Sequence, residues 1–396
     1  MITREQALEH IATIGPLGET ENVPLHDCLG RTLAGDVRAR LTHPPAPMSA
    51  MDGYAVRFGR DLDEGPLQLI GEAAAGAPFE GAVAPGQCVR VFTGSVVPEG
   101  ADHVVIQEDV RREGEKIWIE TPQDKPKNIR PAGVDFSEGD LLLAAGTQIS
   151  PMHLSICAAA NHASLTLCRR PKVGLLTNGD ELRPPGSPLQ PGQIIASNEY
   201  ALMALIRECG GEPVNLGTAA DDPGDIRRRI EAARDLDLYV PVGGASVGDH
   251  DHMKSVFTEL GFEPAFSKIA IKPGKPTWHS RRGSQSVLGL PGNPASALVC
   301  AHLFLRPLMN ALLGHADRHS WIRGRLMADL APNGPREAFL RGTLDQLADG
   351  ATGIQPAANQ DSSLLSPFIT ADVLIHRPAG APALITGDEV DGVILT

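Results

Sequence analysis

The chain has 396 residues, 42% of them hydrophobic and 21% charged, a profile typical of a soluble globular protein with two to four domains. Asp and Glu number 48 against 35 Lys and Arg, and the formal net charge of −13 argues against a general binder of nucleic acid or anionic membranes. The aromatic content of 4% likewise argues against a platform that stacks single-stranded bases.

The first 170 residues predict a helical start and then a β-rich insertion. Residues 3–14 predict a helix capped by Thr3, because apolar side chains recur there at helical spacing. Prolines between 44 and 47 mark a boundary, and short strands with turns follow up to about residue 120. Helix and short-strand character then returns. We expect a discontinuous N-terminal domain and an inserted β-rich domain, with these limits: residues 1–43 and 137–170 for the first, and 44–136 for the second.

The second part of the chain alternates strands and helices. This rhythm predicts a doubly wound α/β domain over residues 171–317, in which ligands bind at the carboxyl ends of the strands. Residues 318–396 lose the helical rhythm and predict a small β-barrel or sandwich. The expected fold class is therefore multidomain α/β plus β.

The stretch from Leu236 to Leu260 is the centre of the predicted α/β domain. Leu236–Val242 predicts a buried strand, Gly243–Gly248 a glycine-rich turn, and Asp249–Leu260 a helix. A strand that leads through glycines into a helix N-terminus presents backbone N–H groups to an anion such as phosphate. The turn has neither the P-loop nor the GxGxxG spacing. A tight strand-to-helix turn without a ligand is the alternative for this loop taken alone.

Carboxylates cluster at the predicted strand ends. The loop 177–181 contains Asp180 and Glu181, Asp221 ends another strand, and Asp249 and Asp251 follow the glycine turn. A further loop, 289–294, opens a helix and has a backbone suited to phosphate. Mg²⁺ prefers oxygen ligands and bridges phosphates, so these loops together indicate an anion held with a hard cation. For each carboxylate alone, a solvated loop or a helix N-cap is the alternative.

Three lysines mark the segment 267–275. Lys268 and Lys272 would share one face of a predicted strand, and Lys275 would follow at its carboxyl end. A lysine on a sheet face is costly unless it meets an anion, so we favour a ligand-binding role. An edge strand protected by lysines is the alternative.

Other patterns bear on chemistry and compartment. The consecutive residues 249–252, Asp-His-Asp-His, diverge around a turn and do not suit a transition-metal site, and no pattern supports hydrolytic or nucleophilic catalysis. The six cysteines form no C-x-x-C pair, which indicates reduced, mostly buried thiols in a cytoplasmic protein. The N-terminus has no apolar signal core. The apolar helix predicted over 295–313 contains Arg306 and Pro307, which argues against a membrane span.

Seven motifs, in order, resemble those of the molybdopterin molybdenumtransferase family, known as MoeA in bacteria and as the C-terminal part of gephyrin in animals. They are SAMDGYAV (49–56), VFTGSVVPEGAD (91–102), NIRPAGVDFSEGD (128–140), NGDEL (178–182), GGASVGD (243–249), IKPGKP (271–276) and GLPGNPASA (289–297). The resemblance implies a four-domain, L-shaped protomer and a homodimer with its site at the subunit interface. It also implies insertion of molybdenum from molybdate into adenylylated molybdopterin, with Mg²⁺, to give molybdenum cofactor and AMP.

The resemblance also implies site residues. The catalytic set is Asp52, Thr93, Glu181, Asp221, Asp251, Lys268, Lys272, Arg341 and Ser362. The cofactor-binding set is Gly179, Asp180, Gly243, Gly244, Ser246, Gly248, Asp249, Lys275, Pro291, Gly292, Asn293 and Pro294. Glu181, Asp221 and Asp251 would hold Mg²⁺ against the pyrophosphate. The lysines would neutralise phosphate and molybdate, and Arg341 and Ser362 would be further oxyanion donors.

Three residues depart from the family pattern: Asn178 replaces a usual Thr, Val134 a frequent Glu, and Asp361 a usual Gly. These departures leave open a paralogue with altered metal specificity, for example for tungstate. A non-catalytic molybdopterin-binding carrier or scaffold is a separate alternative, against which the lysine and carboxylate set argues. A related adenylylating enzyme is a further alternative, against which the extra domains argue. The expected partners are a second copy of the chain, molybdopterin adenylyltransferase and molybdoenzymes, with no nucleic acid and no membrane.

Overall fold

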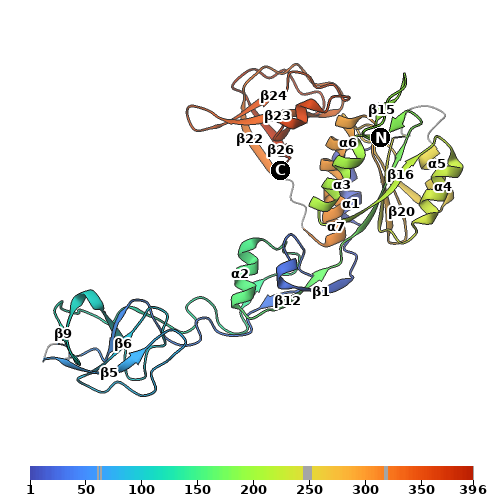
Figure 1. Cartoon of the computed structure of the whole chain (residues 1–396). Coiled ribbons are helices and arrows are strands. Elements are labelled where there is room, and N and C mark those ends of the chain that lie inside the picture. Colours follow the sequence, from blue (N-terminus) through green and yellow to red (C-terminus); the bar gives the residue numbers. More distant parts are fainter. Residues whose placement is uncertain (60–61, 63–64, 244–251, 316–319, 396) are drawn as a thin grey trace. The chain divides into compact units, whose positions relative to one another are not determined.

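Three six-stranded sheets organise the described part of the chain, which comprises residues 1–59, 62, 65–243, 252–315 and 320–395 of a computed structural model (Figure 1). The chain divides into two units, one formed by residues 1–21, 30–34 and 167–396 and the other by residues 22–29 and 35–166. We describe each unit by itself.

The first unit contains the predicted α/β sheet, in the order β16-β13-β17-β21-β20-β18. Four strands are parallel: β16 (Glu212–Ala219), β13 (Lys172–Asn178), β17 (Leu238–Val242) and β21 (Gln285–Gly289). The sheet is completed by antiparallel pairing of β20 (Trp278–Arg282) with β21 and of β18 (Glu263–Phe266) with β20. The prediction of a parallel sheet is thus right for the four strands that carry the loops, and incomplete at one edge.

Helices cover both faces of this sheet. Alternate side chains along β13 explain how: Leu175 belongs to one buried cluster and Leu176 to the other. The first cluster includes residues of α1 (Arg4–Ala12), α3 (Asn198–Glu208), α6 (Pro294–Cys300) and α7 (Arg306–Leu313). The second includes residues of α4 (Pro223–Ala232) and α5 (His252–Glu259). Six of the seven residues of β13 are buried, as in a strand covered on both sides.

The predicted helix boundaries are largely confirmed. Thr3 caps α1 and shares a reciprocal capping box with Gln6. The long apolar helix runs from Pro294 to Leu313 and contains a π-helical turn, Ala301–Leu305, directly before α7. Pro307 explains this turn, because its ring lacks an N–H and would clash with the carbonyl one turn earlier. This helix is long and apolar enough to cross a membrane, but 72% of its most apolar window is buried inside the chain, the pattern of a core helix.

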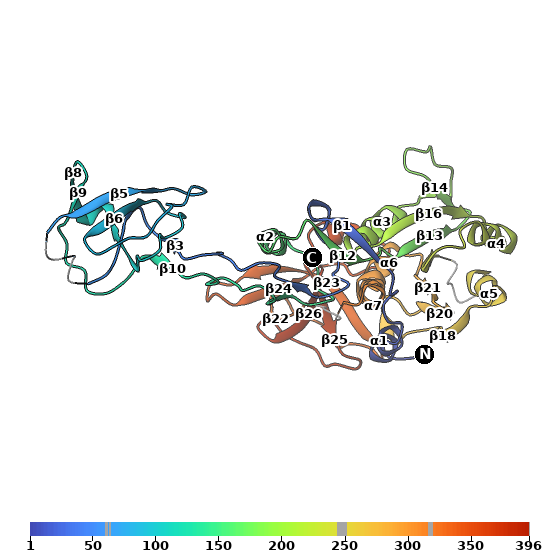
Figure 2. The ribbon, with the colours of Figure 1, turned by 90° about the horizontal axis from the view of Figure 1, so that it is seen from below.

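The C-terminal residues form a closed five-stranded barrel (Figure 2). Its strands are β22 (Trp321–Leu326), β23 (Glu337–Gln346), β24 (Thr352–Pro356), β25 (Val373–Arg377) and β26 (Glu389–Ile394). The order is β23-β24-β22-β26-β25, and pairing of β25 with β23 closes it. A two-residue strand from the lysine segment, β19 (Ile271–Lys272), pairs parallel to β23. The barrel prediction is confirmed over its sandwich alternative.

The second unit contains the β-rich sheet, in the order β7-β4-β6-β5-β9-β8. The bounds are β4 (Gly53–Val56), β5 (Leu67–Ala73), β6 (Gln87–Val91), β7 (His103–Ile106), β8 (Val110–Glu113) and β9 (Lys116–Ile119). Both faces bear buried apolar clusters. The shorter elements of the chain are β1 (Thr20–Pro24), β2 (Val37–Arg38), β3 (Met48–Ser49), β10 (Ile129–Arg130), β11 (Leu141–Leu143), α2 (Pro151–Ala159), β12 (Ser164–Cys168), β14 (Leu182–Arg183) and β15 (Ile194–Ile195).

All six cysteines are free thiols, and five of them are buried. Burial raises the pKa of Cys88 and of Cys300 to about 12, so both thiols stay protonated and unreactive. The prediction of reduced, mostly buried thiols agrees with this placement.

Candidate functional site

The loops predicted to carry the site meet at the carboxyl ends of β13, β16 and β17. The chain passes from β13 to β16 on one side and later to β17 on the other, so the sheet has a switch point beside β13. Open α/β sheets bind their ligands in the crevice at such a point. Asn178, the last residue of β13, is paired with Ala219 at the end of β16.

Two polar side chains, those of Asn178 and Asp180, bond Asp221, and Glu181 follows Asp180 in the same loop. Asn178 donates through Nδ2 to Asp221 Oδ1, and the backbone N–H of Asp221 donates to Asp180 Oδ1 at 3.3 Å. The carboxylate of Glu181 folds back over Gly179, where an added Cβ would lie 2.6 Å from Oε2. Asp180, Glu181 and Asp221 are exposed, whereas Asn178 is only 6% exposed. The structure therefore brings Asp180 and Asp221 together at an accessible place, with the exposed carboxylate of Glu181 in the same loop.

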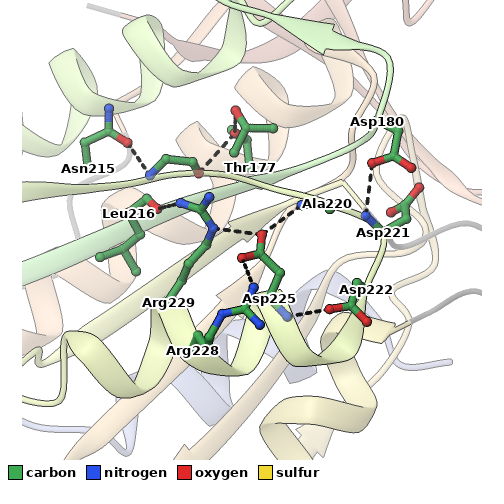
Figure 3. Close-up of polar contacts among 12 residues, drawn as sticks. Thr177, Asp180, Asn215, Leu216, Ala220, Asp221, Asp222, Asp225, Arg228 and Arg229 are labelled. Atoms are coloured by element: carbon green, nitrogen blue, oxygen red, sulfur yellow. Dashed lines mark hydrogen bonds and ion pairs between the residues drawn. The ribbon is translucent and has the colours of Figure 1, made fainter.

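The N-cap alternative applies to the neighbouring carboxylate. Asp222 caps α4, because its Oδ2 accepts from the backbone N–H of Asp225 at 2.8 Å (Figure 3). Asp221 caps none of the helices whose N-terminus is described, so its carboxylate is available to a ligand in addition to Asn178.

The glycine turn after β17 begins against the same loop. The backbone N–H of Gly243 donates to Leu290 O at 3.2 Å. Gly243 has φ +92°, and an added Cβ would lie 2.7 Å from the carbonyl oxygen of Asn178. This close approach requires glycine. Five predicted residues of this turn and of the helix start lie outside the described residues: Gly244, Ser246, Gly248, Asp249 and Asp251.

The loop after β21 connects the sheet with the barrel. Asn293 Nδ2 donates to Ser362 Oγ at 3.0 Å, and the Ala295 N–H donates to Ser362 O at 3.0 Å. The carbonyl of Gly292 accepts from Asn198 Nδ2 at 2.7 Å, while Pro291 is buried and Pro294 begins α6. Ser362 thus lies at the start of α6, and its hydroxyl hydrogen has no acceptor among the described residues.

Two buried acceptors at this edge have no partner among the described residues. They are Asn178 Oδ1 and Asn198 Oδ1. A buried amide oxygen without a hydrogen bond is unfavourable. Each of these two oxygens could therefore accept a hydrogen bond from a ligand or a water molecule, or bind a cation. The sequence analysis did not identify Asn198. Its only signal was a polar residue at the first position of a helix that opens at the strand ends.

Arg341, a site residue that the resemblance implies, is buried beneath the loop that carries Ser362. It is 3% exposed and donates four hydrogen bonds to the loop that carries Ser362, to the Gln360 side chain and to the carbonyls of Asn359, Asp361 and Leu364. Burial lowers the pKa of its guanidinium, an effect that the charge of Asp361 opposes. In this arrangement Arg341 shapes the loop.

Asp361 is also engaged within the same loop. Its Oδ1 accepts from the hydroxyl of Ser363 at 2.6 Å and from the Ser363 N–H at 2.8 Å, and these two bonds lower the pKa of the carboxyl group. Its negative charge is therefore retained and directed at its own turn.

The lysine segment differs from its prediction. Lys268 lies outside β19, so it does not share a strand face with Lys272, and β19 belongs to the barrel sheet instead of the α/β sheet. The segment turns back on itself, since the Ile269 N–H donates to Lys275 O at 3.1 Å. The prediction of one strand that carries both Lys268 and Lys272 is wrong, because the strand contains only Ile271 and Lys272. Its length is set by pairing with β23, which is distant in sequence and could not be read from the segment itself. Lys272 and Lys275 are exposed and Lys268 is partly buried.

In the second unit the structure brings Asp52 and Thr93 together. Asp52 Oδ1 accepts from the Thr93 N–H at 2.7 Å and from Thr93 Oγ1 at 2.8 Å. These bonds lower the pKa of Asp52, so the carboxyl group is ionised at neutral pH. Arg90 adjoins this pair and donates to Gly53 O at 3.4 Å.

The side chains at the sheet edge are of the chemical type that a hard cation binds. Carboxylate oxygens of Asp180, Glu181 and Asp221 and the unpartnered Asn178 Oδ1 are the ligand type that Mg²⁺ prefers. Within the described ranges, no group of three or more His, Cys, Asp or Glu residues is close enough to hold a metal by itself. The Mg²⁺ set of Glu181, Asp221 and Asp251 therefore stays a prediction.

Family models match three consecutive parts of the chain. They are described as MoeA N-terminal region (domain I and II), residues 2–161; Probable molybdopterin binding domain, residues 174–311; and MoeA C-terminal region (domain IV), residues 323–395. The fold and the site thus define a multidomain protein of MoeA type, built around a domain of the molybdopterin-binding kind.

Individual relatives narrow this class. The chain is 35% identical to a molybdopterin molybdenumtransferase of Nostoc over 94% of its own length and 88% of the relative's, and 34% identical to one of Haemophilus influenzae over 95% and 94%. A solved structure of the molybdopterin biosynthesis MoeA protein of Pyrococcus horikoshii is 31% identical, covers 100% and 99% of the two chains and has a TM-score of 0.85. The chain belongs to the molybdopterin molybdenumtransferase family and is a transferase.

Proposed function

We propose that this enzyme transfers molybdenum from molybdate to adenylylated molybdopterin, with release of AMP. The observation that carries the proposal is the junction of Asn178, Asp180, Glu181 and Asp221 at the sheet switch point. A phosphoanhydride with its cation needs oxygen ligands in an accessible crevice, and this edge supplies them. The names of the relatives support molybdopterin and molybdenum transfer, and the adenylyl group and the release of AMP are part of this proposal.

Mg²⁺, when bound, would neutralise the pyrophosphate and polarise its phosphorus–oxygen bonds. Glu181 and Asp221, with Asp251 as the predicted third ligand, would hold it. Lys272 and Lys275 are exposed and would attract the anionic substrates. Ser362 Oγ accepts from Asn293, which leaves its hydroxyl hydrogen to bond an oxyanion.

Buried acceptors would orient the organic part of the substrate. Asn198 Oδ1 is fixed in direction because the Nδ2 of the same amide bonds Gly292 O. A ligand N–H group that meets this oxygen would satisfy both partners. The gain of a reaction that joins two bound substrates comes mainly from such orientation, about 7–11 kcal/mol at best.

The deciding experiment is AMP release from adenylylated molybdopterin with Mg²⁺, in the presence and absence of molybdate. Molybdate-dependent release is expected. Glu181→Ala and Asp221→Asn should reduce it by about 100-fold or more, by analogy with the removal of a preorganised transition-state contact. Glu212→Gln is the matched control, since it removes an exposed carboxylate from the opposite end of β16.

The alternatives give different results in the same assay. Binding of adenylylated molybdopterin without AMP release under any condition would indicate a carrier or scaffold. Release that requires tungstate would indicate a tungstate-specific enzyme. Wild-type rates in both Glu181→Ala and Asp221→Asn would contradict the site assignment.

The expected partners belong to the same proposal. We propose a homodimer that acts in the cytoplasm, receives its substrate from molybdopterin adenylyltransferase and delivers its product to molybdoenzymes. Light scattering on the purified protein would test the dimer, and a monomer at the concentration of the assay would contradict it.

A further inference from the structure

Strand β16 contains a bulge just before the loop that carries Asp221. Leu175 of β13 pairs with Asn215, whereas Thr177 pairs with Thr218, so Leu216 and Gly217 lie opposite a single residue. Gly217 has φ +77°, and its N–H donates to Asn215 Oδ1 at 2.7 Å. The bulge advances the end of β16 and thereby sets which residue lies beside Asn178.

The hydroxyl of Thr177 holds the bulge on the β13 side. It donates to Gly217 O at 3.3 Å and lies 2.8 Å from Thr218 Oγ1 (Figure 3). Thr177 is 3% exposed, so this contact is part of the buried sheet.

Arg229 of α4 joins the bulge to the Asp221 loop. Its Nη1 donates to Leu216 O at 2.8 Å, and its Nε donates to Asp225 Oδ2 at 3.0 Å. The same Asp225 oxygen accepts from the Ala220 N–H at 3.0 Å. A continuous chain of hydrogen bonds therefore runs from Leu216, through Arg229 and Asp225, to the residue before Asp221 (Figure 3).

The Arg229 side chain packs closely against the bulge, and the Asp225–Arg229 pair is partly buried. An added Cβ on Gly217 would lie 2.8 Å from Arg229 Nη1, so the guanidinium rests directly on the bulge. Asp225 is 18% exposed and Arg229 is 34% exposed. The bond from Arg229, followed by that from Ala220, lowers the pKa of Asp225, so the pair is charged at neutral pH.

We propose that Asp225 and Arg229 are positioning residues, which fix Asp221 for the reaction by tying its loop to the β16 bulge. They contact neither substrate nor cation. They restrict the backbone at Ala220, while Asn178 and Asp180 restrict Asp221 from the other side. This role rests on the proposed function, because it is a role in the use of Asp221.

Arg228 supplies a matched control. It forms an ion pair with the other Asp225 oxygen, Oδ1, at 2.8 Å, but it is 72% exposed and donates to neither Leu216 nor the loop. Arg228→Ala therefore removes a charge and an ion pair from the same carboxylate without cutting the chain of bonds.

The experiment compares Asp225→Ala, Asp225→Asn, Arg229→Met and Arg228→Ala in the AMP-release assay, as a function of Mg²⁺ and substrate concentration. We expect Asp225→Ala and Arg229→Met to lower kcat by about tenfold or more and to raise the Mg²⁺ concentration needed for half-maximal rate, since a loosened carboxylate is costly at an aligned site. Asp225→Asn should be intermediate, because its amide oxygen still accepts from Ala220. Arg228→Ala should stay within about twofold of wild type.

Thermal unfolding and hydrogen exchange on segment 217–222 separate positioning from general damage. The expected result is faster exchange of this segment in Asp225→Ala, with the melting temperature of the remaining fold retained. Equal kcat values in Asp225→Ala and Arg228→Ala would overturn the proposal, as would a loss explained entirely by the unfolded fraction. A wild-type chain that releases no AMP would instead overturn the proposed function, so the two failures are distinguishable.

Discussion

We predict that His279→Leu stabilises the α/β sheet and makes its free energy of unfolding less dependent on pH in the acidic range. His279 lies in β20 and is 0% exposed, and neither ring nitrogen has a partner among the described residues. Its ring lies 5.6 Å from that of Phe266. Burial is the main cause that lowers the pKa of His279 from 6.5 to about 4, and the charges of Arg281 and His10 add to it.

The sign follows from proton linkage. As the pH falls below 6.5 the unfolded chain binds a proton at this residue before the folded chain does, so the free energy of unfolding decreases from pH 6.5 down to about pH 4. Above pH 6.5 this residue adds almost nothing to the pH dependence of the free energy of unfolding. These two pKa values give a loss of about 2 kcal/mol between pH 7 and pH 5. Leucine removes this loss and also removes two unsatisfied buried groups, each of which costs about 1–3 kcal/mol.

Trp278 provides a local probe, because it precedes His279 and is 3% exposed. In a background with Trp118→Phe and Trp321→Phe, fluorescence during urea unfolding reports on this sheet. Ser286→Ala is the control, since it removes a buried hydroxyl without a partner but no titrating group. It should raise the stability equally at pH 7 and pH 5. If His279→Leu lost as much free energy of unfolding as wild type between these pH values, the buried ring would not be the proton acceptor and the reasoning would fail.

Three other predictions concern single contacts. Gly53→Ala should destabilise the β-rich sheet by about 3 kcal/mol, because the added Cβ would overlap a backbone oxygen of β7. Gly35→Ala is the control: its added Cβ would meet no atom within 4 Å, so this variant should melt like wild type. Asn178→Ala should slow AMP release about tenfold, because it removes the hydrogen bond that holds Asp221. Asn178→Asp should slow it further, because it places a second negative charge beside that carboxylate, and a rate above that of Asn178→Ala would contradict this. Arg341→Lys should lower the free energy of opening of the loop 359–364 by about 2 kcal/mol, as measured by amide hydrogen exchange, because lysine cannot form the same set of bonds. Unchanged protection of the loop amides would refute this prediction.

The alternation of strands and helices was predictable because each element carries its own signal. The N-terminal helix capped by Thr3 has apolar side chains at helical spacing and occurs as predicted, and strands and helices alternate after residue 171 as predicted. The antiparallel pairing of β20 with β21 and of the edge strand β18 with β20 was not predicted. β18 and β20 are short, and the chain between them leaves the sheet to add β19 to the barrel, so their pairing depends on contacts far apart in sequence.

The site was predictable to the level of its loops and no further. Parallel strands bring their carboxyl ends to one edge, which is why Asp180, Glu181 and Asp221 could be expected together. The partners of each side chain could not be expected. Whether Asp221 or Asp222 caps α4 depends on one residue of register at a bulge, and the burial of Arg341 depends on how the loop 359–364 closes over it.

The lysine segment shows how remote parts of the chain fix a local feature. The backbone of Ile2 donates to Lys268 O at 3.0 Å and accepts from the Ala270 N–H at 2.8 Å. The Glu337 N–H at the start of β23 donates to Ala270 O at 3.1 Å, and Arg4 of α1 bonds the Glu337 side chain at 2.9 Å. The N-terminal residues, the lysine segment and the barrel thus form one hydrogen-bonded layer. The α/β fold alone cannot place these lysines, so their position relative to the sheet edge depends on how the N-terminus and the barrel pack.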